Sequence, residues 1–345
     1  MAIRATIILG SILGLPMAAS AAPAAHAHAP ALKQQSDTAR HTLETEMARI
    51  ARGAGGEVGV LARDLRSGRT VAMNEREAFP MASTFKIAVA GAILSQVDAH
   101  RLDLQQMVNV DPKLMLSSEG IAEIFPFPGV AASVHNLIES MLTRSDNTAT
   151  NVLAQLAGGP AAVTAWVESL GIKGMRIDGD TNGIIGRFFE LPPSGDSVEV
   201  QLNRLQAVNP ALEELGTKPN AKFDDDPRDT ASPESMIELL TKIKGGHLLT
   251  ANSTDVLLGA MQRCITGKKR LRGLLPPGTQ VADKTGTIGG TVNDVGFITL
   301  PEGRGEFAIA VYIKKSPKSF EDRESVIAQI ARLVYDYMLI ESSDP

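Results

Sequence analysis

The sequence is poor in the residues that build disulfide-rich, metal-binding and nucleic-acid-binding proteins. Its 345 residues contain one cysteine, Cys264, which excludes an internal disulfide framework and any zinc or iron–sulfur site built from cysteines. The formal net charge is -5, so the chain lacks the basic surface that neutralises nucleic-acid phosphates. The six histidines are scattered without metal-ligand spacing, and no Gly-x-x-x-x-Gly-Lys nucleotide loop is present. We therefore expect a protein that uses no metal, cofactor or nucleic acid.

Long hydrophobic runs are also missing after the first residues, which resemble an export signal. Arg4 precedes an apolar stretch over residues 5–18, and small residues follow over 19–21, as in secretory signals. The stretch is short and interrupted by Pro16, so it is poorly suited to span a membrane. We expect cleavage near Ala21 and an exported protein, periplasmic or secreted, with an uncleaved anchor as the alternative.

The next segment, residues 22–37, consists mostly of Ala, Pro, His and Gln, a composition that buries too little surface to fold. It predicts a flexible tail. His26 and His28 lie in it without a neighbouring carboxylate, which favours a linker over a metal site.

The remaining chain alternates between strand and helix patterns. A helical pattern starts at Thr38 and ends at the glycines of residues 53–56, and strands are predicted over 58–63 and 69–73. At the other end, strands over 293–300 and 307–313 precede a helix whose apolar face lies within 326–338. Strands from both ends indicate one sheet built by the two termini. Helices are predicted between them, over residues 84–96, 134–143, 148–156, 160–170, 233–244 and 254–265. The pattern therefore predicts an α/β part closed by both termini and an inserted all-α part.

Three short motifs bear polar side chains suited to nucleophilic catalysis. Ser83 and Lys86 lie one turn apart at a helix start, where the amine can reach the hydroxyl and free N–H groups can hold an oxyanion. Ser145-Asp146-Asn147 falls between two predicted helices, and Lys284-Thr285-Gly286-Thr287 follows a short apolar run. Taken singly, each has an ordinary structural explanation as a helix cap or a strand end. Together, in one order, they indicate a single site.

The three motifs resemble those of class A β-lactamases and penicillin-binding proteins. The flanking residues resemble class A β-lactamases more than penicillin-binding proteins, and the resemblance covers roughly residues 38–340. It is carried by residues 79–86, 145–151, 228–233, 283–287 and 293–294. The resemblance implies an α/β plus all-α fold, with an antiparallel sheet flanked by terminal helices. It also implies the following division: an α/β subdomain of residues 38–83 and 273–345, and a helical subdomain of 84–272 that includes an omega-loop-like region over 177–232.

The resemblance also implies the roles of the acylating residues. Ser83 would attack a β-lactam carbonyl and become acylated, with Lys86 as base or proton relay. Ser145 would pass a proton to the departing ring nitrogen. Lys284 would attract the substrate carboxylate, and its charge would make Lys86 easier to deprotonate.

Substrate binding is implied for a second group of residues. Asn147 would bind the side-chain amide of the substrate, Thr285 would bind its carboxylate, and Gly286 would line the site. The backbone N–H groups of Ser83 and Thr287 would form the oxyanion hole. No arginine lies between residues 289 and 300, so Arg270 is the candidate that supports the carboxylate, with a solvated basic turn as the alternative.

The residues that would hydrolyse the acyl-enzyme fit the family less well. Glu199 and Asn203 match a Glu-x-x-Leu-Asn pattern, but Ser197 stands where the family has arginine. The loop is also longer than in the family. We predict that Glu199 activates the water with Asn203 beside it. Glu190 is a second candidate for this role. Alternatively, the residues around Glu199 form an ordinary amphipathic helix, and the site has no water-activating glutamate.

Three functions follow from these alternatives. With a water-activating glutamate, the chain is a monomeric serine β-lactamase acting on a small-molecule β-lactam, with no nucleic-acid or membrane partner. Without one, it is a related D-Ala-D-Ala peptidase or esterase that deacylates poorly. A non-catalytic ligand-binding protein is the alternative from another class.

Overall fold

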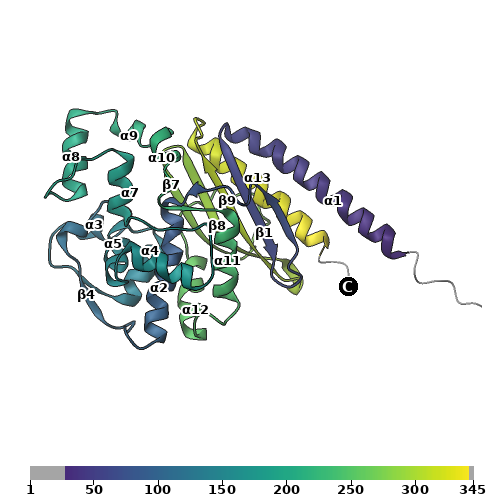
Figure 1. The fold of residues 1–345 in the computed structure, drawn as a ribbon, viewed down its shortest axis with the longest axis horizontal. Coiled ribbons are helices and arrows are strands. Elements are labelled where there is room, and N and C mark those ends of the chain that lie inside the picture. The colour runs from purple at the N-terminus through teal and green to yellow at the C-terminus, as the bar shows by residue number, and fades with distance from the viewer. Residues whose placement is uncertain (1–27, 342–345) are drawn as a thin grey trace, which may run out of the picture. The chain divides into compact units, whose positions relative to one another are not determined.

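A five-stranded antiparallel sheet forms the centre of the fold, with strand order β2-β1-β9-β8-β7 (Figure 1). The computed structural model describes residues 28–341, so the predicted leader and residues 22–27 of the tail lie outside the described residues. Strand β1 pairs with β9 along its whole length, with Glu57 opposite Lys314 and Asp64 opposite Phe307. The prediction of one sheet built from both ends of the chain is therefore confirmed. The strands of this sheet are β1 Glu57–Asp64, β2 Thr70–Met73, β7 Val281–Ile288, β8 Thr291–Thr299 and β9 Glu306–Lys314.

Helix α1 runs over His28–Ala51 and begins earlier than the Thr38 start that the apolar pattern predicts. Ala, Leu, Lys and Gln favour helix, and Pro30 is tolerated because it falls in the first turn. Residues 28–37, which the composition assigns to a flexible tail, are therefore helical. The helix ends before Gly55, whose φ of 63° closes the turn. From His41 onward, the chain forms one compact unit.

Two hydrophobic cores lie on opposite faces of the sheet within this unit. Residues of β1 alternate between them: Val60 belongs to the core shared with helix α13 (Phe320–Glu341), whereas Leu61 belongs to the core shared with the inserted helices. Leu43 and Met47 of α1 join the first core. This alternation follows from the two-residue period of a strand.

The predicted helices between the strands are all present. Pro160 and Pro233 each occupy a first turn, as expected. The helices are α2 Lys86–Asp98, α4 Val134–Thr143, α5 Asn147–Leu156, α6 Pro160–Ser169, α11 Pro233–Lys244 and α12 Ala251–Gln262. Short elements join them: β3 Phe79–Pro80, η2 Ala82–Phe85, β4 Met107–Asn109, η3 Pro112–Leu114, α3 Ile121–Ile124, β5 Ala131–Ser133, β6 Thr230–Ala231 and η4 Pro301–Gly303.

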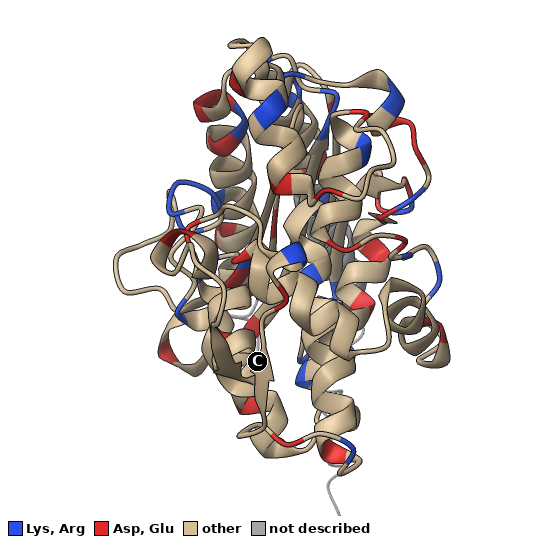
Figure 2. Ribbon diagram, turned by 90° about the vertical axis from the view of Figure 1, so that its left-hand side faces the viewer, with Lys and Arg blue, Asp and Glu red and all other residues tan. Residues whose placement is uncertain are grey.

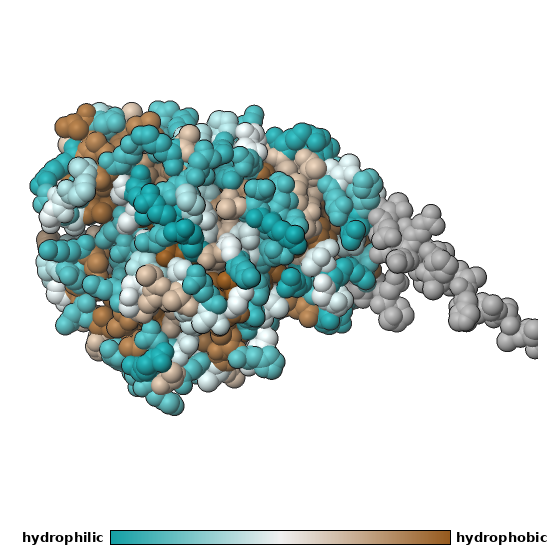
Figure 3. All heavy atoms as spheres, viewed as in Figure 1, coloured by the Kyte–Doolittle hydropathy of each residue, from teal (hydrophilic) through white to brown (hydrophobic). Residues whose placement is uncertain are grey.

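The omega-loop-like region contains four helices of its own: α7 Thr181–Phe188, α8 Val198–Val208, α9 Leu212–Leu215 and α10 Ala221–Asp224. Helix α8 contributes no buried residue. Val208 and Leu215 are 79% and 50% exposed, and apolar side chains are visible at the α8–α9 end of the molecule (Figure 3). The surplus chain length therefore forms a surface layer.

Along the ribbon, positions of Lys and Arg are interspersed with positions of Asp and Glu on the side shown in Figure 2. Within residues 28–341, none of the helices has the length and apolar character needed to cross a membrane.

Candidate active site

Ser83 lies in the 3-10 turn η2, which leads directly into α2. The residue before it, Ala82, has a φ of 44°, a left-handed conformation that costs free energy in a residue with a Cβ. Neighbouring chain segments hold this turn in place. The Met81 N–H donates to the Asp229 carbonyl at 2.9 Å, and Asn293 Nδ2 donates to the Met81 carbonyl at 3.0 Å. The turn that presents Ser83 is thus fixed by both the omega-loop-like region and the sheet.

Lys86 is completely buried and faces the second motif. Its Nζ donates to the Ser145 carbonyl at 2.7 Å, to Ser145 Oγ at 3.2 Å and to Asn147 Oδ1 at 2.9 Å. Burial, assisted by the charge of Lys284, lowers the pKa of Lys86 well below its usual value, although Asp146 opposes this. A lysine with a lowered pKa next to the nucleophile's turn loses its proton more easily than an ordinary lysine, which suits it to act as a base.

The Ser145 hydroxyl lies between two lysines. Its Oγ accepts from Lys86 at 3.2 Å and from Lys284 at 2.9 Å. Both lone pairs are then occupied, so the hydroxyl proton remains free for a substrate atom. Ser145 has a φ of 59°, and the adjacent Asp146 caps α5 by accepting from the Ala149 N–H at 3.1 Å. The second motif is thus both a helix cap and part of the site.

The third motif lies on β7, an edge strand of the sheet that runs beside η2. Lys284 is completely buried, and burial lowers its pKa to about 8. A Cβ added to Gly286 would lie 2.5 Å from the Met81 carbonyl and 3.2 Å from the Ser83 nitrogen. Only glycine therefore lets the strand approach the nucleophile this closely. Thr285 Oγ1 lies 2.7 Å from Thr266 Oγ1.

Arg270 is buried behind this strand rather than solvated. Its Nη2 donates to Thr287 Oγ1 at 2.7 Å, and its Nη1 donates to the Gly286 carbonyl at 3.1 Å. Its Nε forms an ion pair with Glu324 at 3.1 Å. These contacts place a guanidinium directly beside the Lys-Thr-Gly residues.

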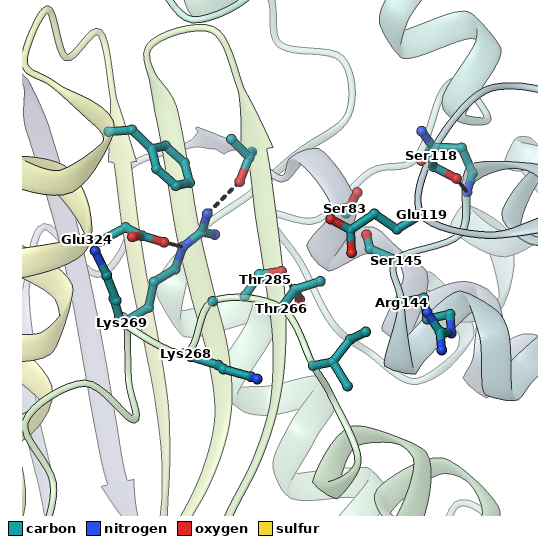
Figure 4. A pocket seen from close by; sticks show the side chains of 16 residues that line it. Ser83, Ser118, Glu119, Arg144, Ser145, Thr266, Lys268, Lys269, Thr285 and Glu324 are labelled. Carbon is teal, nitrogen blue, oxygen red and sulfur yellow. Dashed lines mark hydrogen bonds and ion pairs between the residues drawn. The ribbon is translucent and has the colours of Figure 1, made fainter. Parts of the chain in front are cut away.

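A cavity of about 510 Å³ joins the three motifs. Figure 4 shows Ser83 and Ser145 close together at one side and Thr285 with Thr266 at the other. The lining residues are Ser83, Ser118, Glu119, Arg144, Ser145, Asn147, Ile265, Thr266, Gly267, Lys268, Lys269, Arg270, Thr285, Thr287, Phe320 and Glu324. Sequence reasoning missed Ser118, Glu119 and Thr266, because single loop residues carry no spacing that could mark them.

Glu199 lies beside this site without being among the residues that line the cavity. Its carboxylate accepts from the Ser117 N–H at 2.9 Å and from Ser117 Oγ at 2.8 Å. Asn203 Nδ2 donates to it at 3.4 Å, so the predicted pair is formed. Asn147 Nδ2 in turn donates to the Ser117 carbonyl at 3.4 Å. Ser117 therefore separates Glu199 from the motif residues.

Glu190, the second candidate, lies on the surface in an ion pair with Lys222 at 2.8 Å. The two ends of the omega-loop-like region are joined instead by Arg187, which donates through Nη2 to Asp229 Oδ2. Asp229 Oδ1 also accepts from the Asp178 N–H at 2.8 Å and the Gly179 N–H at 2.9 Å. The pairing of Arg187 with Asp229 across the loop could not be foreseen, because the two residues lie 42 positions apart in the sequence.

Among residues 28–341, no group of three His, Cys, Asp or Glu side chains is placed to hold a metal ion. The arrangement consists of a serine on a strained turn, a buried lysine with a lowered pKa and a hydroxyl shared by two lysines. Together with the fold, these features define a serine enzyme of the acyl-transfer class.

Comparisons with known proteins specify the family. Residues 42–338 match the model of the Beta-lactamase enzyme family. The chain is 30% identical over 305 residues to the extended-spectrum beta-lactamase PER-1 of Pseudomonas aeruginosa, covering 86% of this chain and 87% of that one. It is 30% identical over 304 residues to the carbapenem-hydrolyzing beta-lactamase KPC of Klebsiella oxytoca, covering 87% and 91%. A solved beta-lactamase from Chitinophaga pinensis matches with a TM-score of 0.69 at 30% identity, covering 86% and 98%.

The chain therefore belongs to the beta-lactamase enzyme family and is a serine β-lactamase of the class A type. The fold expected from the motif resemblance is confirmed.

Proposed function

We propose that Ser83 opens the β-lactam ring and that Lys86, Ser145 and Lys284 move and balance the protons. The observation that carries this proposal is the Ser145 hydroxyl, which accepts from both buried lysines at 3.2 and 2.9 Å in the cavity that Ser83 lines. A chain of hydrogen bonds thus connects Lys86 as the base, Ser145 as the proton donor and Lys284 as the charge that attracts substrate.

In the acylation step, neutral Lys86 takes the proton of Ser83 Oγ, which bonds to the lactam carbonyl carbon. The oxyanion is held by the N–H groups of Ser83 and Thr287. The carbon–nitrogen bond of the ring then breaks, and the nitrogen takes the Ser145 proton. Lys86 returns its extra proton to Ser145, so the step is balanced.

Substrate is held from two sides in this proposal. Lys284 and Thr285 bind the ring carboxylate, supported by Arg270 behind the strand and with Gly286 giving access. Asn147 binds the side-chain amide with its Nδ2, because its Oδ1 accepts from Lys86.

For the hydrolysis of the acyl-enzyme, we propose Glu199 as the group that activates water, with Asn203 as its partner. The hydrogen bond between them at 3.4 Å supports the pair. Ser117 lies between Glu199 and Asn147. We therefore propose that substrate binding brings Glu199 closer to the acyl group.

The test follows turnover of a chromogenic cephalosporin together with the intact mass of the enzyme. We expect Ser83→Ala to abolish both turnover and the covalent adduct. Glu199→Gln should acylate at the wild-type rate, then stall, with turnover lowered about 100-fold or more. Glu190→Gln is the matched control and should turn over like the wild type. Wild-type turnover in Glu199→Gln would remove Glu199 from the mechanism.

We further propose that the enzyme is exported, with its leader cleaved near Ala21, and acts as a monomer in the periplasm or outside the cell. The leader residues support export. The intact mass of the mature protein tests the cleavage site, and size-exclusion chromatography with light scattering tests the monomeric state.

A further inference from the structure

The substrate cavity contains one carboxylate without a charged partner. Its lining includes four cationic residues, Arg144, Lys268, Lys269 and Arg270, and two acidic ones. Glu324 forms an ion pair with Arg270 and is buried, so its charge is balanced. The side chain of Glu119, in contrast, makes no ion pair with any residue of the described range 28–341. Glu119 therefore presents a free negative charge to whatever occupies the cavity.

This charge lies on the side of the cavity formed by Ser83 and Ser145. In Figure 4, the Glu119 carboxylate points toward Ser83 and Ser145, whereas Lys268 and Lys269 lie on the opposite side. Arg144 is drawn beyond Ser145. Three of the four cationic residues therefore lie on the side of the Lys-Thr-Gly strand, whereas the Glu119 carboxylate and Arg144 lie on the side of the second motif.

The backbone on both sides of Glu119 is anchored. On one side, Ser118 Oγ accepts from the Asn147 N–H at 3.0 Å. On the other side, the Ile121 N–H donates to Asp146 Oδ2 at 2.9 Å. A Cβ at the intervening Gly120 would lie 2.3 Å from the Asp146 carboxyl carbon, so this segment packs tightly on the second motif. The Glu119 backbone is therefore held beside Asn147, the residue proposed to bind the acyl side chain.

We infer that Glu119 is a specificity-determining residue that favours β-lactams whose acyl side chain carries an ammonium group. The inference rests on the substrate orientation given under the proposed function. The ring carboxylate of such a zwitterion faces the cationic residues on the side of the Lys-Thr-Gly strand, while its ammonium faces Glu119. A side chain that bears a second carboxylate meets repulsion at the same place.

The experiment uses three penicillins that share a phenylacetyl side chain and differ at its α-carbon, which carries hydrogen, an ammonium or a carboxylate. In the wild type, kcat/KM should follow the order ammonium, hydrogen, carboxylate. Glu119→Gln should reduce the preference for ammonium over hydrogen by about fivefold, the contribution of one solvent-exposed ion pair. It should change kcat/KM for the hydrogen compound less than about twofold.

Two further variants and a salt series sharpen the result. Glu119→Lys should reverse the order in favour of the carboxylate compound, and Glu119→Asp should retain the wild-type order. The wild-type preference should shrink as ionic strength rises, because the charge is exposed. Glu123→Gln, which removes another exposed carboxylate four residues along the chain and outside the cavity lining, is the matched control and should keep the wild-type order.

Two outcomes overturn the inference. One is an unchanged preference in Glu119→Gln. The other is an equal loss of kcat on all three substrates with acyl-enzyme accumulating, which would make Glu119 part of deacylation. If the wild type turns over none of them, the proposed hydrolysis fails instead, and the ratio of acylation rates measured by mass still tests Glu119.

Discussion

At the scale of single residues, the two buried lysines around Ser145 divide their charge unequally. Lys86 and Lys284 both donate to one hydroxyl, and their mutual repulsion adds to the cost of burial. Lys284 has buried carboxylates nearby, including Asp283 and Asp294, which favour its charged form. The arrangement therefore favours the charged form of Lys284, which suits substrate binding, more than that of Lys86, which suits proton transfer.

This division predicts an alkaline limit to activity. The pKa of Lys284 is about 8, so the side chain is charged below that pH and neutral above it. Attraction for the substrate carboxylate is lost as the pH rises, and kcat/KM should fall about tenfold per pH unit above roughly 8, mainly through KM. A pH–rate profile from 6 to 10 measures this.

Lys284→Arg separates the cause from a general loss of stability, because a guanidinium stays charged over the whole range. Its alkaline limb should disappear even if its activity at pH 7 is lower than that of the wild type. An alkaline limb that stays near pH 8 in this variant would assign the titration to another group.

Sequence reasoning performs well for residues that occur in spaced motifs and poorly for isolated ones. Ser83, Ser145 and Asn147 line one cavity as expected, and Thr285 and Arg270 line it too. Glu119 and Thr266 could not be foreseen, because their positions depend on how distant loops fold onto the site. The catalytic role of Glu199 stays a prediction that the mass experiment addresses.

At the scale of elements, the surplus chain of residues 177–232 is tied to the nucleophile through Asp229 and through the pairing of β6 with β3. Asp229 receives the Arg187 guanidinium and two backbone N–H groups through its side chain, and its carbonyl accepts from Met81 beside Ser83. Helix boundaries in this region were hard to foresee, since α8 packs on the surface and lacks a buried face. The terminal strands, in contrast, have clear two-residue periods and were predicted well.

Asp229→Asn should therefore weaken both the fold and catalysis. Removing this buried charge leaves Arg187 with only its longer ion pair to Asp226 at 3.9 Å, which should lower the free energy of unfolding by about 3 kcal/mol. Loosening the nucleophile's turn should also lower kcat. Urea unfolding and turnover of the folded fraction check the two effects.

Arg176→Ala is the control for this variant, because Arg176 is exposed and pairs with Asp178 in the same region. It should change stability by no more than about 0.5 kcal/mol. Equal effects of the two substitutions would contradict the special position of Asp229.

At the scale of the whole molecule, the sheet belongs to both hydrophobic cores, so damage to either core should reach the site. Ile330 of α13 is completely buried in the core on the face away from the inserted helices. Ile330→Ala should lower the free energy of unfolding by about 3 kcal/mol. The loss of helical signal and of activity on heating should coincide, because both cores share β1, β8 and β9.

Ile340→Ala makes the same chemical change near the end of that helix, where the side chain is 71% exposed. Its effect should stay within about 0.5 kcal/mol. Separate transitions for helical signal and activity in Ile330→Ala would show that the two cores unfold independently.

The strand order has a consequence for how the enzyme is made. The nucleophile is synthesised early, whereas β7, which supplies Lys284, and β9, the partner of β1, emerge from the ribosome late. A nascent chain therefore carries Ser83 without the strand that completes the cavity and with β1 still lacking its long partner. Activity therefore requires translation of nearly the entire polypeptide, and a chain truncated before residue 284 is inactive.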